Sequence, residues 1–329
     1  MTESPIARRT LLVLGAGSIL SRAARAQPSQ RPIIFVVPQP AGNPTDALAR
    51  KLLPALQKEL GQPVIVENVP GAGGSLGVHK ALASGADGQV LLVTSQTEPI
   101  LTPIGLASAR YRPDDLRCIA LAGSGPYLLV GRADLPATSH AELVALATRS
   151  RERPLNFAHI GQGSMIHLMG ERWSRKVGAP LNHVPYRGVP PVIEDLLGRQ
   201  VDLTFVPLGG PTIELVESGK VRVFGSSGAI ASARLPKVPT LSTLDPALSD
   251  FVHTSWAAVF VPRATSEASA LRLHAALAAA LADADVQAFI DASGADRAPA
   301  ATPADLARFY LGEIRLYQAL AKEVGISTQ

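Results

Sequence analysis

The sequence predicts an α/β protein with largely parallel sheets. Short runs rich in β-branched residues alternate with segments of helical periodicity along the chain, which is the pattern of strands joined by crossover helices. The first of these runs is apolar over its whole length, as expected of a buried strand. From residue 27 onward the chain has 303 residues, which is enough for two domains.

The first strand and helix begin this pattern. Residues 33–37 form the continuous apolar run that predicts a buried strand. Leucines at four-residue spacing from Leu48 to Leu60 place one apolar stripe on the helix that follows. Pro54 lies inside this helix and should kink it, at a local cost of about 3 kcal/mol. Gly61 should end the helix before a second strand at residues 64–67.

The same alternation continues to the C-terminus. Further strands are predicted at residues 90–93, 119–122, 127–130, 156–158, 183–185, 203–206, 221–225 and 257–261. Further helices are predicted at residues 139–149, 164–176, 189–198, 212–218, 266–282 and 303–324. There is no internal repeat and no long flexible linker, so we expect the domains to be joined by crossing strands.

Residues 1–26 have the pattern of a secretory signal peptide. The pair Arg8–Arg9 precedes an apolar stretch at residues 11–20, and Ala24–Ala26 supplies a cleavage pattern that would leave Gln27 first. A ten-residue helix rises only about 15 Å, half of a bilayer core, so the stretch is too short for an anchor. The arginine pair favours twin-arginine export, and an ordinary secretory signal with a basic start is the alternative.

Charge and cysteine content narrow the class of protein. Four of the 31 basic residues and one of the 27 acidic residues lie in the first 26, so the chain from Gln27 on has a net charge of +1. This near-neutral balance, without a basic run and with few aromatic residues, gives no support for nucleic-acid binding. Cys118 is the only cysteine, which excludes an internal disulfide. The profile fits a bacterial periplasmic protein.

The loop at residues 39–46 follows the first strand and opens a helix. Gly42 permits close approach of the backbone, and the N–H groups of the first helical turn can hold an anion. The alternative is a plain helix cap, in which Asn43 or Thr45 caps the helix and Asp46 interacts favourably with the helix dipole. These residues alone favour the cap.

The glycine-rich segment at residues 70–77 also follows a strand and opens a helix. It does not match the dinucleotide-binding pattern G-x-G-x-x-G, because its last glycine comes one position late. No acidic residue closes a second strand at the required distance either. We therefore expect tight strand-to-helix packing here, and no bound cofactor.

A third loop contains a serine and several histidines. Ser164 can cap the following helix, while N–H groups around Gly163 can hold a carboxylate. Catalysis by Ser164 with His167 is not expected, because the motif G-x-S-x-G is absent and residues three apart on one helix make a poor pair. A metal site from His159, His167 and His183 is not expected either, because their spacing matches no metal motif.

Two further polar positions have open roles. Residues 94–98 follow a strand and can offer hydroxyl and N–H groups to a ligand, or simply turn the chain. Asp202 precedes the strand at residues 203–206 and can accept a hydrogen bond from a ligand, or cap a turn.

Taken in order, several segments resemble the tricarboxylate-transporter receptor family, the Bug-type periplasmic solute-binding proteins. The matching stretches are residues 36–42, 45–50, 60–68, 70–74, 155–158, 161–164 with His167, 183–188, 195–203, 236–240 and 255–256. They cover nearly the whole chain after the signal peptide, and so many ordered matches are hard to obtain by chance.

The resemblance implies a two-domain periplasmic binding protein of type II-like architecture. Each domain would be a mainly parallel sheet flanked by helices, with the ligand cleft between the domains. Domain 1 would comprise residues 27–124 and 255–329, and domain 2 residues 125–254. Two strands would cross between them.

The resemblance also implies a receptor that captures a small carboxylate and delivers it to the subunits of a tripartite tricarboxylate-type membrane transporter. N–H groups of loops from both domains would hold the carboxylate, partly through water. Carried over onto this chain, the expected binding residues are Gln39, Pro40, Ala41, Gly42, Asn43, Thr94, Ser95, Gln96, Thr97, Gln162, Gly163, Ser164, His167 and Asp202. We expect a periplasmic monomer without catalytic residue, cofactor, metal or nucleic-acid partner.

Three departures from the family pattern leave the ligand open. Asn43 stands where the family usually has a second glycine, Glu98 lies near the expected carboxylate, and Pro207 replaces a polar residue. Aspartate, glutamate, citrate, an aromatic acid or an uncharged compound all remain candidates. The alternative functions are a periplasmic sensor that signals ligand occupancy to a membrane partner, and a secreted serine hydrolase built on Ser164.

Deleting residues 2–26 should leave the protein in the cytoplasm, because the export signal is removed. Cell fractionation followed by immunoblotting measures this. The double substitution Arg8→Lys/Arg9→Lys separates the two routes, since only the twin-arginine route requires the pair. Export of the shortened chain would contradict the signal assignment.

Overall fold

The computed structural model describes residues 31–85 and 87–326. The predicted signal peptide, residues 1–26, lies outside the described residues. From Pro32 onward the chain forms one compact unit of strands and helices, so the predicted α/β class is confirmed.

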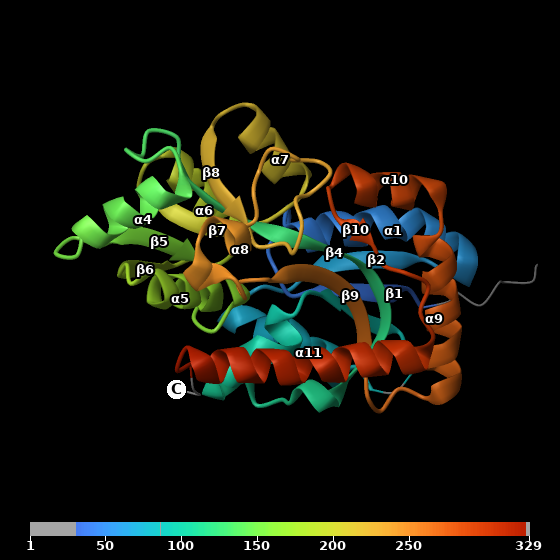
Figure 1. The fold of residues 1–329 in the computed structure, drawn as a ribbon. Coiled ribbons are helices and arrows are strands. Elements are labelled where there is room, and N and C mark those ends of the chain that lie inside the picture. Colours follow the sequence, from blue (N-terminus) through green and yellow to red (C-terminus); the bar gives the residue numbers. More distant parts are fainter. Residues whose placement is uncertain (1–30, 86, 327–329) are drawn as a thin grey trace, which may run out of the picture. The chain divides into compact units, whose positions relative to one another are not determined.

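Two groups of three parallel strands form the outer parts of one continuous sheet (Figure 1). The strand order is β2-β1-β3-β9-β4-β7-β5-β6. The first group consists of β1 (Ile33–Val37), β2 (Val64–Asn68) and β3 (Val90–Thr94). The second consists of β5 (Leu155–His159), β6 (Leu181–Pro185) and β7 (Leu203–Pro207). The expectation of parallel sheets is therefore correct for both groups.

Two long antiparallel strands, β4 (Leu116–Arg132) and β9 (Thr254–Pro262), join the groups. The first part of β4 pairs with β9, and its last part lies between β7 and β8 (Val221–Ser226). A two-residue strand, β10 (Asp296–Arg297), also pairs with β4. The centre of the sheet is thus antiparallel, which the sequence prediction missed.

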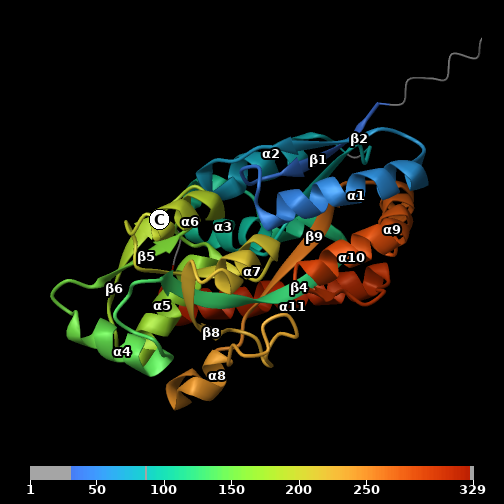
Figure 2. The same ribbon diagram turned by 90° about the horizontal axis from the view of Figure 1, so that it is seen from above.

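The two strands predicted at residues 119–122 and 127–130 are one strand. Gly123, Gly125 and Pro126 lie between them, and such residues usually weaken or end a strand. Here they stay paired with β9, although the register shifts between Leu121 and Gly123, and β4 runs on for 17 residues (Figure 2). The predicted domain boundaries after residues 124 and 254 fall within β4 and β9, and they stay a prediction.

Helices cover both faces of the sheet. Their bounds are α1 Pro44–Leu60, α2 Ser75–Ala83, α3 Thr102–Gly105, α4 His140–Arg149, α5 Met165–Val177, α6 Val189–Leu197, α7 Gly210–Glu217, α8 Leu241–Leu244, α9 Glu267–Leu281, α10 Ala284–Ala292 and α11 Pro303–Glu323. The helix α1 continues through Pro54 and ends at Gly61, whose left-handed φ of 63° and N–H bond to Gln57 O form the predicted C-terminal cap. The helices α3, α8 and α10 were not predicted.

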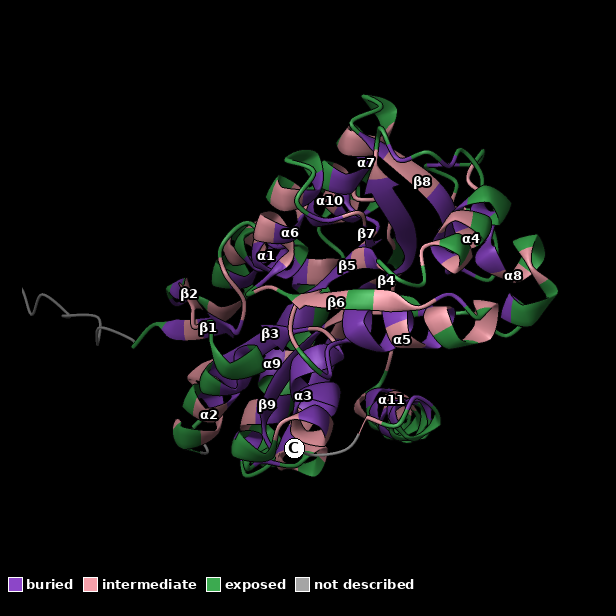
Figure 3. Ribbon diagram, turned by 90° about the vertical axis from the view of Figure 1, so that its left-hand side faces the viewer, coloured by how far each residue is buried: buried purple, intermediate pink, exposed green. Residues whose placement is uncertain are grey.

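Figure 3 shows the buried residues of the sheet and of the helices around it. The apolar core that they form differs between the two sides of the sheet. On one side, a single cluster runs under both strand groups and is covered by α2, α4, α5 and α11. On the other side, α1, α9 and α10 cover the first group, while α6 and α7 cover the second. This side therefore has two separate clusters.

The C-terminal helix α11 fastens the continuous side (Figure 1). Its Glu313 accepts a hydrogen bond of 2.6 Å from Trp256 Nε1 in β9. Its Glu323 accepts one of 2.9 Å from Arg172 Nε in α5.

Within residues 31–85 and 87–326, no single helix is long and apolar enough to cross a membrane. Only α9 and α10 taken together have the length and composition of a span, and a bend of 69° lies between them.

Replacing Arg172 by alanine should lower the free energy of unfolding by about 2 kcal/mol. The Arg172 side chain is buried, and it donates to Asp250 Oδ2 at 2.7 Å as well as to Glu323. Both carboxylates are half exposed and stay hydrated after the change, so the loss is smaller than for a fully buried pair. Urea unfolding measures it, with Arg149→Ala, at an exposed position of α4, as control. Equal losses in the two variants would contradict the fastening role.

Candidate functional site

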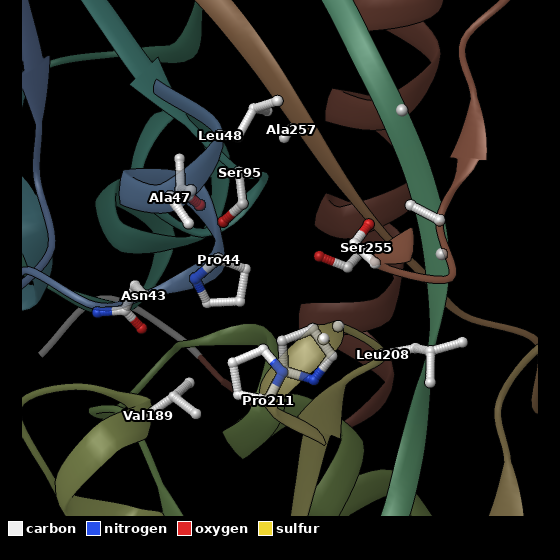
Figure 4. A pocket seen from close by; sticks show the side chains of 18 of the residues that line it. Asn43, Pro44, Ala47, Leu48, Ser95, Val189, Leu208, Pro211, Ser255 and Ala257 are labelled. Carbon is white, nitrogen blue, oxygen red and sulfur yellow. The ribbon is translucent and has the colours of Figure 1, made fainter. Parts of the chain in front are cut away.

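A cavity of about 570 Å³ lies on the side of the sheet where the core is divided. Its lining comes from α1 and the loop before it, from the segment after β3, from β4 and β9, and from α7 and α10. Figure 4 shows Ser95 and Ser255 on two sides of the open space, with Val189 and Pro211 across from them. Both strand groups and both crossing strands thus contribute to one cavity.

The loop between β1 and α1 forms one wall. Gly42 has a positive φ of 87°, and its N–H donates to Asp46 Oδ2 at 3.0 Å. Asn43 is the N-cap residue, but its side chain donates to Pro40 O at 2.9 Å and makes no cap bond. Of the predicted residues in this loop, Gln39, Gly42 and Asn43 line the cavity, whereas Pro40 and Ala41 do not.

Asp46 holds this loop in shape. Burial alone would raise its pKa, but hydrogen bonds from Arg50, the Gly42 N–H and Asn68 hold the pKa below its ordinary value. The ionised carboxylate therefore fixes Gly42, and its negative charge interacts favourably with the positive end of the α1 dipole. The first turn of α1 leaves backbone N–H groups without helical partners, and these are donors that an anion can use.

The segment after β3 divides its predicted residues between two roles. Ser95 and Thr97 line the cavity. Gln96 is fully buried behind them, and its amide donates to the Tyr127 hydroxyl of β4 at 2.7 Å. The sequence pointed to this segment but could not separate the residues that line the cavity from those that support it.

Glu98 lies behind this wall and does not line the cavity. Its carboxyl group accepts hydrogen bonds from Thr94 Oγ1 at 2.6 Å and from Gln39 Nε2 at 2.8 Å. Burial raises its pKa, and the hydrogen bonds from Thr94 and Gln39 act in the opposite direction. Glu98 therefore ties the end of β3 to the β1–α1 loop instead of facing a bound anion.

The third predicted loop supports the cavity from behind. Ser164 is the N-cap of α5, and its Oγ accepts from the His167 N–H at 3.3 Å. Gly163 packs so closely on Gly105 that a Cβ at Gly105 would lie 2.9 Å from Gly163 Cα. Gln162, Gly163, Ser164 and His167 do not line the cavity, whereas the neighbouring Met165 and Ile166 do. The predicted cap is thus confirmed.

Three histidines meet beside this loop, from β5, α5 and β6. His159, His167 and His183 each offer a ring nitrogen within 4.8 Å of the others, a juxtaposition that their spacing in the sequence did not reveal. Burial lowers the pKa of His159 to about 4 and that of His167 to about 3, so both rings are neutral at pH 7.

The hydrogen bonds of this cluster favour packed rings over metal ligands. Nδ1 of His159 accepts from the Gly161 N–H at 3.3 Å, and Nδ1 of His167 accepts from the Gly163 N–H at 3.2 Å. These bonds place the ring protons on Nε2. Metal binding through Nε2 would require the other tautomer of both rings.

Asp202 lies at the other end of its strand from the cavity and does not line it. Its carboxylate accepts from Arg132 Nε at 2.9 Å and from the Asn156 N–H at 2.8 Å. Both oxygens are thus used to join β4, β5 and β7. The carboxylate therefore links neighbouring strands, a role that differs from both the ligand contact and the turn cap considered from the sequence.

Several lining residues were not predicted. Ser124 and Ser255 face the cavity from the crossing strands β4 and β9, and Phe289 does so from α10. The Gly-Ser-Gly sequence at residues 123–125 was the available signal, because small residues inside a strand often mark a close approach to the backbone. Nothing in the sequence marks Phe289, since α10 reaches the cavity only through tertiary packing.

The family model described as "Tripartite tricarboxylate transporter family receptor" matches residues 48–326 of the chain. The protein BugT from Bordetella pertussis is 33% identical over 326 residues, which cover 96% of this chain and 98% of BugT.

Solved structures agree with this match. The periplasmic binding protein BugD has a TM-score of 0.84 at 29% identity, covering 91% of this chain and 99% of its own. MatC from Rhodopseudomonas palustris, solved with bound malate, has a TM-score of 0.81 at 28% identity, covering 88% and 98%. The predicted fold class, a two-domain α/β periplasmic binding protein, is therefore confirmed.

Glu98→Gln should change how stability depends on pH. Because the pKa of Glu98 is raised in the folded protein, its contribution to stability is complete at low pH. It is lost as pH rises from about 4.3, the ordinary value of a glutamate, through the folded pKa. The variant has no proton to lose. As pH rises over this range, the unmodified protein should therefore lose unfolding free energy relative to the variant.

Urea unfolding at intervals between pH 4 and pH 8 measures the difference. Glu152→Gln, at an exposed position, is the control and should follow the unmodified protein. A constant difference between Glu98→Gln and the unmodified protein across the range would contradict the assignment.

Proposed function

Because this chain belongs to the tripartite tricarboxylate transporter receptor family, we propose that it is an extracytoplasmic receptor for a small carboxylate, which it delivers to a tripartite tricarboxylate-type membrane transporter. The observation that carries this proposal is the cavity, which takes neutral hydrogen-bond donors from the first strand group and from the crossing strands, and mostly apolar residues from the second group. The bound malate of MatC supports a carboxylate as the ligand class.

The carboxylate would lie at the end of the cavity formed by the β1–α1 loop. There the N-terminus of α1 supplies backbone N–H groups and a favourable dipole. Ser95, Thr97 and Ser255 add hydroxyl groups from the opposite walls. Such donors stabilise a negative charge without a lysine or arginine beside it.

The remaining predicted residues would act by holding this wall in place. Thr94 and Gln96 fix the segment after β3 through Glu98 and Tyr127. Ser164 and His167 fix the start of α5. The loops before α1 and α5 would owe their shape to the four other predicted residues, Pro40, Ala41, Gln162 and Gly163.

Ligand release and delivery would depend on bending at β4 and β9. A carboxylate bridging the two walls favours the closed arrangement by its differential affinity. The closed surface would then be recognised by the transporter subunits. We place this cycle in the periplasm, with a monomeric receptor exported by residues 1–26.

The test is ligand binding without turnover. The protein is freed of ligand by unfolding and refolding, and a panel of carboxylates is screened by thermal shift and then by calorimetry. A ligand at about 100 times its dissociation constant should add roughly 2.7 kcal/mol of stability. Recovery of the ligand unchanged after incubation supports a receptor. Conversion of the ligand, or silence over all carboxylates, would contradict the proposal.

Ser255→Ala should weaken carboxylate binding by about 1.5 kcal/mol or more, because a hydrogen bond to a charged group is lost. Calorimetry measures the change in affinity. Ser249→Ala, at an exposed position that does not line the cavity, is the control and should bind as the unmodified protein does. Unchanged affinity in Ser255→Ala would remove β9 from the binding site.

A further inference from the structure

The charged side chains that line the cavity lie at its mouth. Among the described lining residues these are Glu214, Glu217 and Arg234, and all three residues are exposed. Two acidic groups and one basic group leave the mouth with a net negative charge. The interior lining contains no lysine, arginine or histidine to neutralise a buried anion.

The interior is divided into a polar end and an apolar body. Asn43 and Ser95 lie beside the first turn of α1, and Ser255 faces them across the open space (Figure 4). Thr97 also lines the cavity. The rest of the wall is largely apolar and includes Leu48, Met165, Leu208, Ile213, Trp256 and Phe289. A ligand that fills this space would present one polar group to the first region and an apolar surface to the second.

The N-terminus of α7 is the other place where a second carboxylate could go. Gly209, Gly210 and Pro211 line the cavity there. Pro211 has no N–H, and the same is true of Pro44 at the start of α1. The two helix starts differ in their acidic groups: Asp46 of α1 is paired with Arg50 and does not line the cavity, whereas Glu214 of α7 is exposed and lines it. The start of α7 is therefore the poorer partner for an anion.

We propose that the cavity takes a monocarboxylate with a large apolar body, and that it discriminates against di- and tricarboxylates. This inference rests on the proposed function and specifies the ligand class. The single carboxylate lies at the polar end, where neutral donors surround it. A second carboxylate would have to lose its hydration among apolar side chains, or to face Glu214 and Glu217 at the mouth.

The size of the cavity agrees with this class. About 570 Å³ is within the range of sites that enclose a ligand of ten or more heavy atoms. A four-carbon diacid would leave most of the apolar wall in contact with water. A phenyl ring or a long alkyl chain would instead remove that wall from water, and this burial supplies the affinity.

The experiment compares hexanoate with adipate, which have the same six-carbon chain and differ only in a methyl group or a second carboxylate. Calorimetry on the ligand-free protein should give hexanoate an affinity at least about tenfold higher than that of adipate. Phenylacetate should bind more tightly than acetate for the same reason. Phenylacetamide, its neutral analogue, should bind much more weakly than phenylacetate.

The outcomes separate the two proposals. Tighter binding of adipate than of hexanoate would overturn the ligand class and leave the carboxylate receptor intact. Binding of phenylacetamide as tightly as phenylacetate, or of no acid at all, would overturn the proposed function itself. A higher affinity for hexanoate than for adipate, together with weaker binding of phenylacetamide than of phenylacetate, supports both the ligand class and the proposed function.

A double variant tests the role of the mouth. Glu214→Gln/Glu217→Gln removes both negative charges from exposed positions of α7, so the fold should not depend on them. Its affinity for adipate should rise by about fivefold or more, while its affinity for hexanoate changes little. Glu152→Gln/Glu194→Gln, away from the cavity lining, is the matched control. An equal change for both ligands would contradict discrimination by these charges.

Discussion

One strand belongs to both halves of this sheet, and the rest of the structure depends on it. The 17 residues of β4 span about 55 Å when extended. The first part is hydrogen bonded to β9, and the last part lies between β7 and β8. Because the same backbone connects the two groups, they cannot separate without breaking sheet hydrogen bonds. Relative motion is thereby limited to bending and twisting of β4 and β9.

The same strand also forms part of the cavity floor. Gly123, Ser124 and Gly125 of β4 and Ser255 of β9 line the cavity at the point where these strands pair. A bend there moves lining residues directly. The same residues of β4 and β9 therefore take part in ligand binding and in the relative motion of the two strand groups. The continuous apolar cluster and α11 hold the opposite side together, which leaves the divided side as the one that can open.

Most polar groups around the cavity are already used by the fold. Glu98 and Asp46 hold loops, Asp202 joins three strands, and two of the three clustered histidines accept hydrogen bonds from backbone N–H groups. What remains for a ligand is a small number of neutral donors. A site of this kind selects ligands by their shape and by their number of negative charges, because its interior lining contains no lysine, arginine or histidine.

The sequence predicted elements well where local patterns decide the structure. The strand at residues 33–37 and the Gly61 cap were correct, because apolar continuity and left-handed φ are local properties. The division of β4 was wrong, because pairing with β9 overrides the glycines and proline within it.

The site could be predicted only as far as its loops. Ser95 and Thr97 were found because strand ends open into such cavities, whereas Gln96 could not be excluded without knowing which face was buried. Ser255 and Phe289 come from elements far along the chain, and only tertiary packing brings them to the cavity. The sequence also left cap and ligand roles of Ser164 undecided, since one hydroxyl is suited to both.

The position of β9 between β3 and β4 has a consequence for synthesis. β3 ends at Thr94 and its neighbour β9 begins at Thr254, so one edge of the first strand group lacks its partner until 160 more residues have been made. At about 5–20 residues per second this takes roughly 8 to 32 seconds. During that time the nascent chain carries an unpaired apolar edge, a known starting point for aggregation. The sheet and its cavity can be completed only after β9 has been made, and late, non-local pairing of this kind should make folding slow.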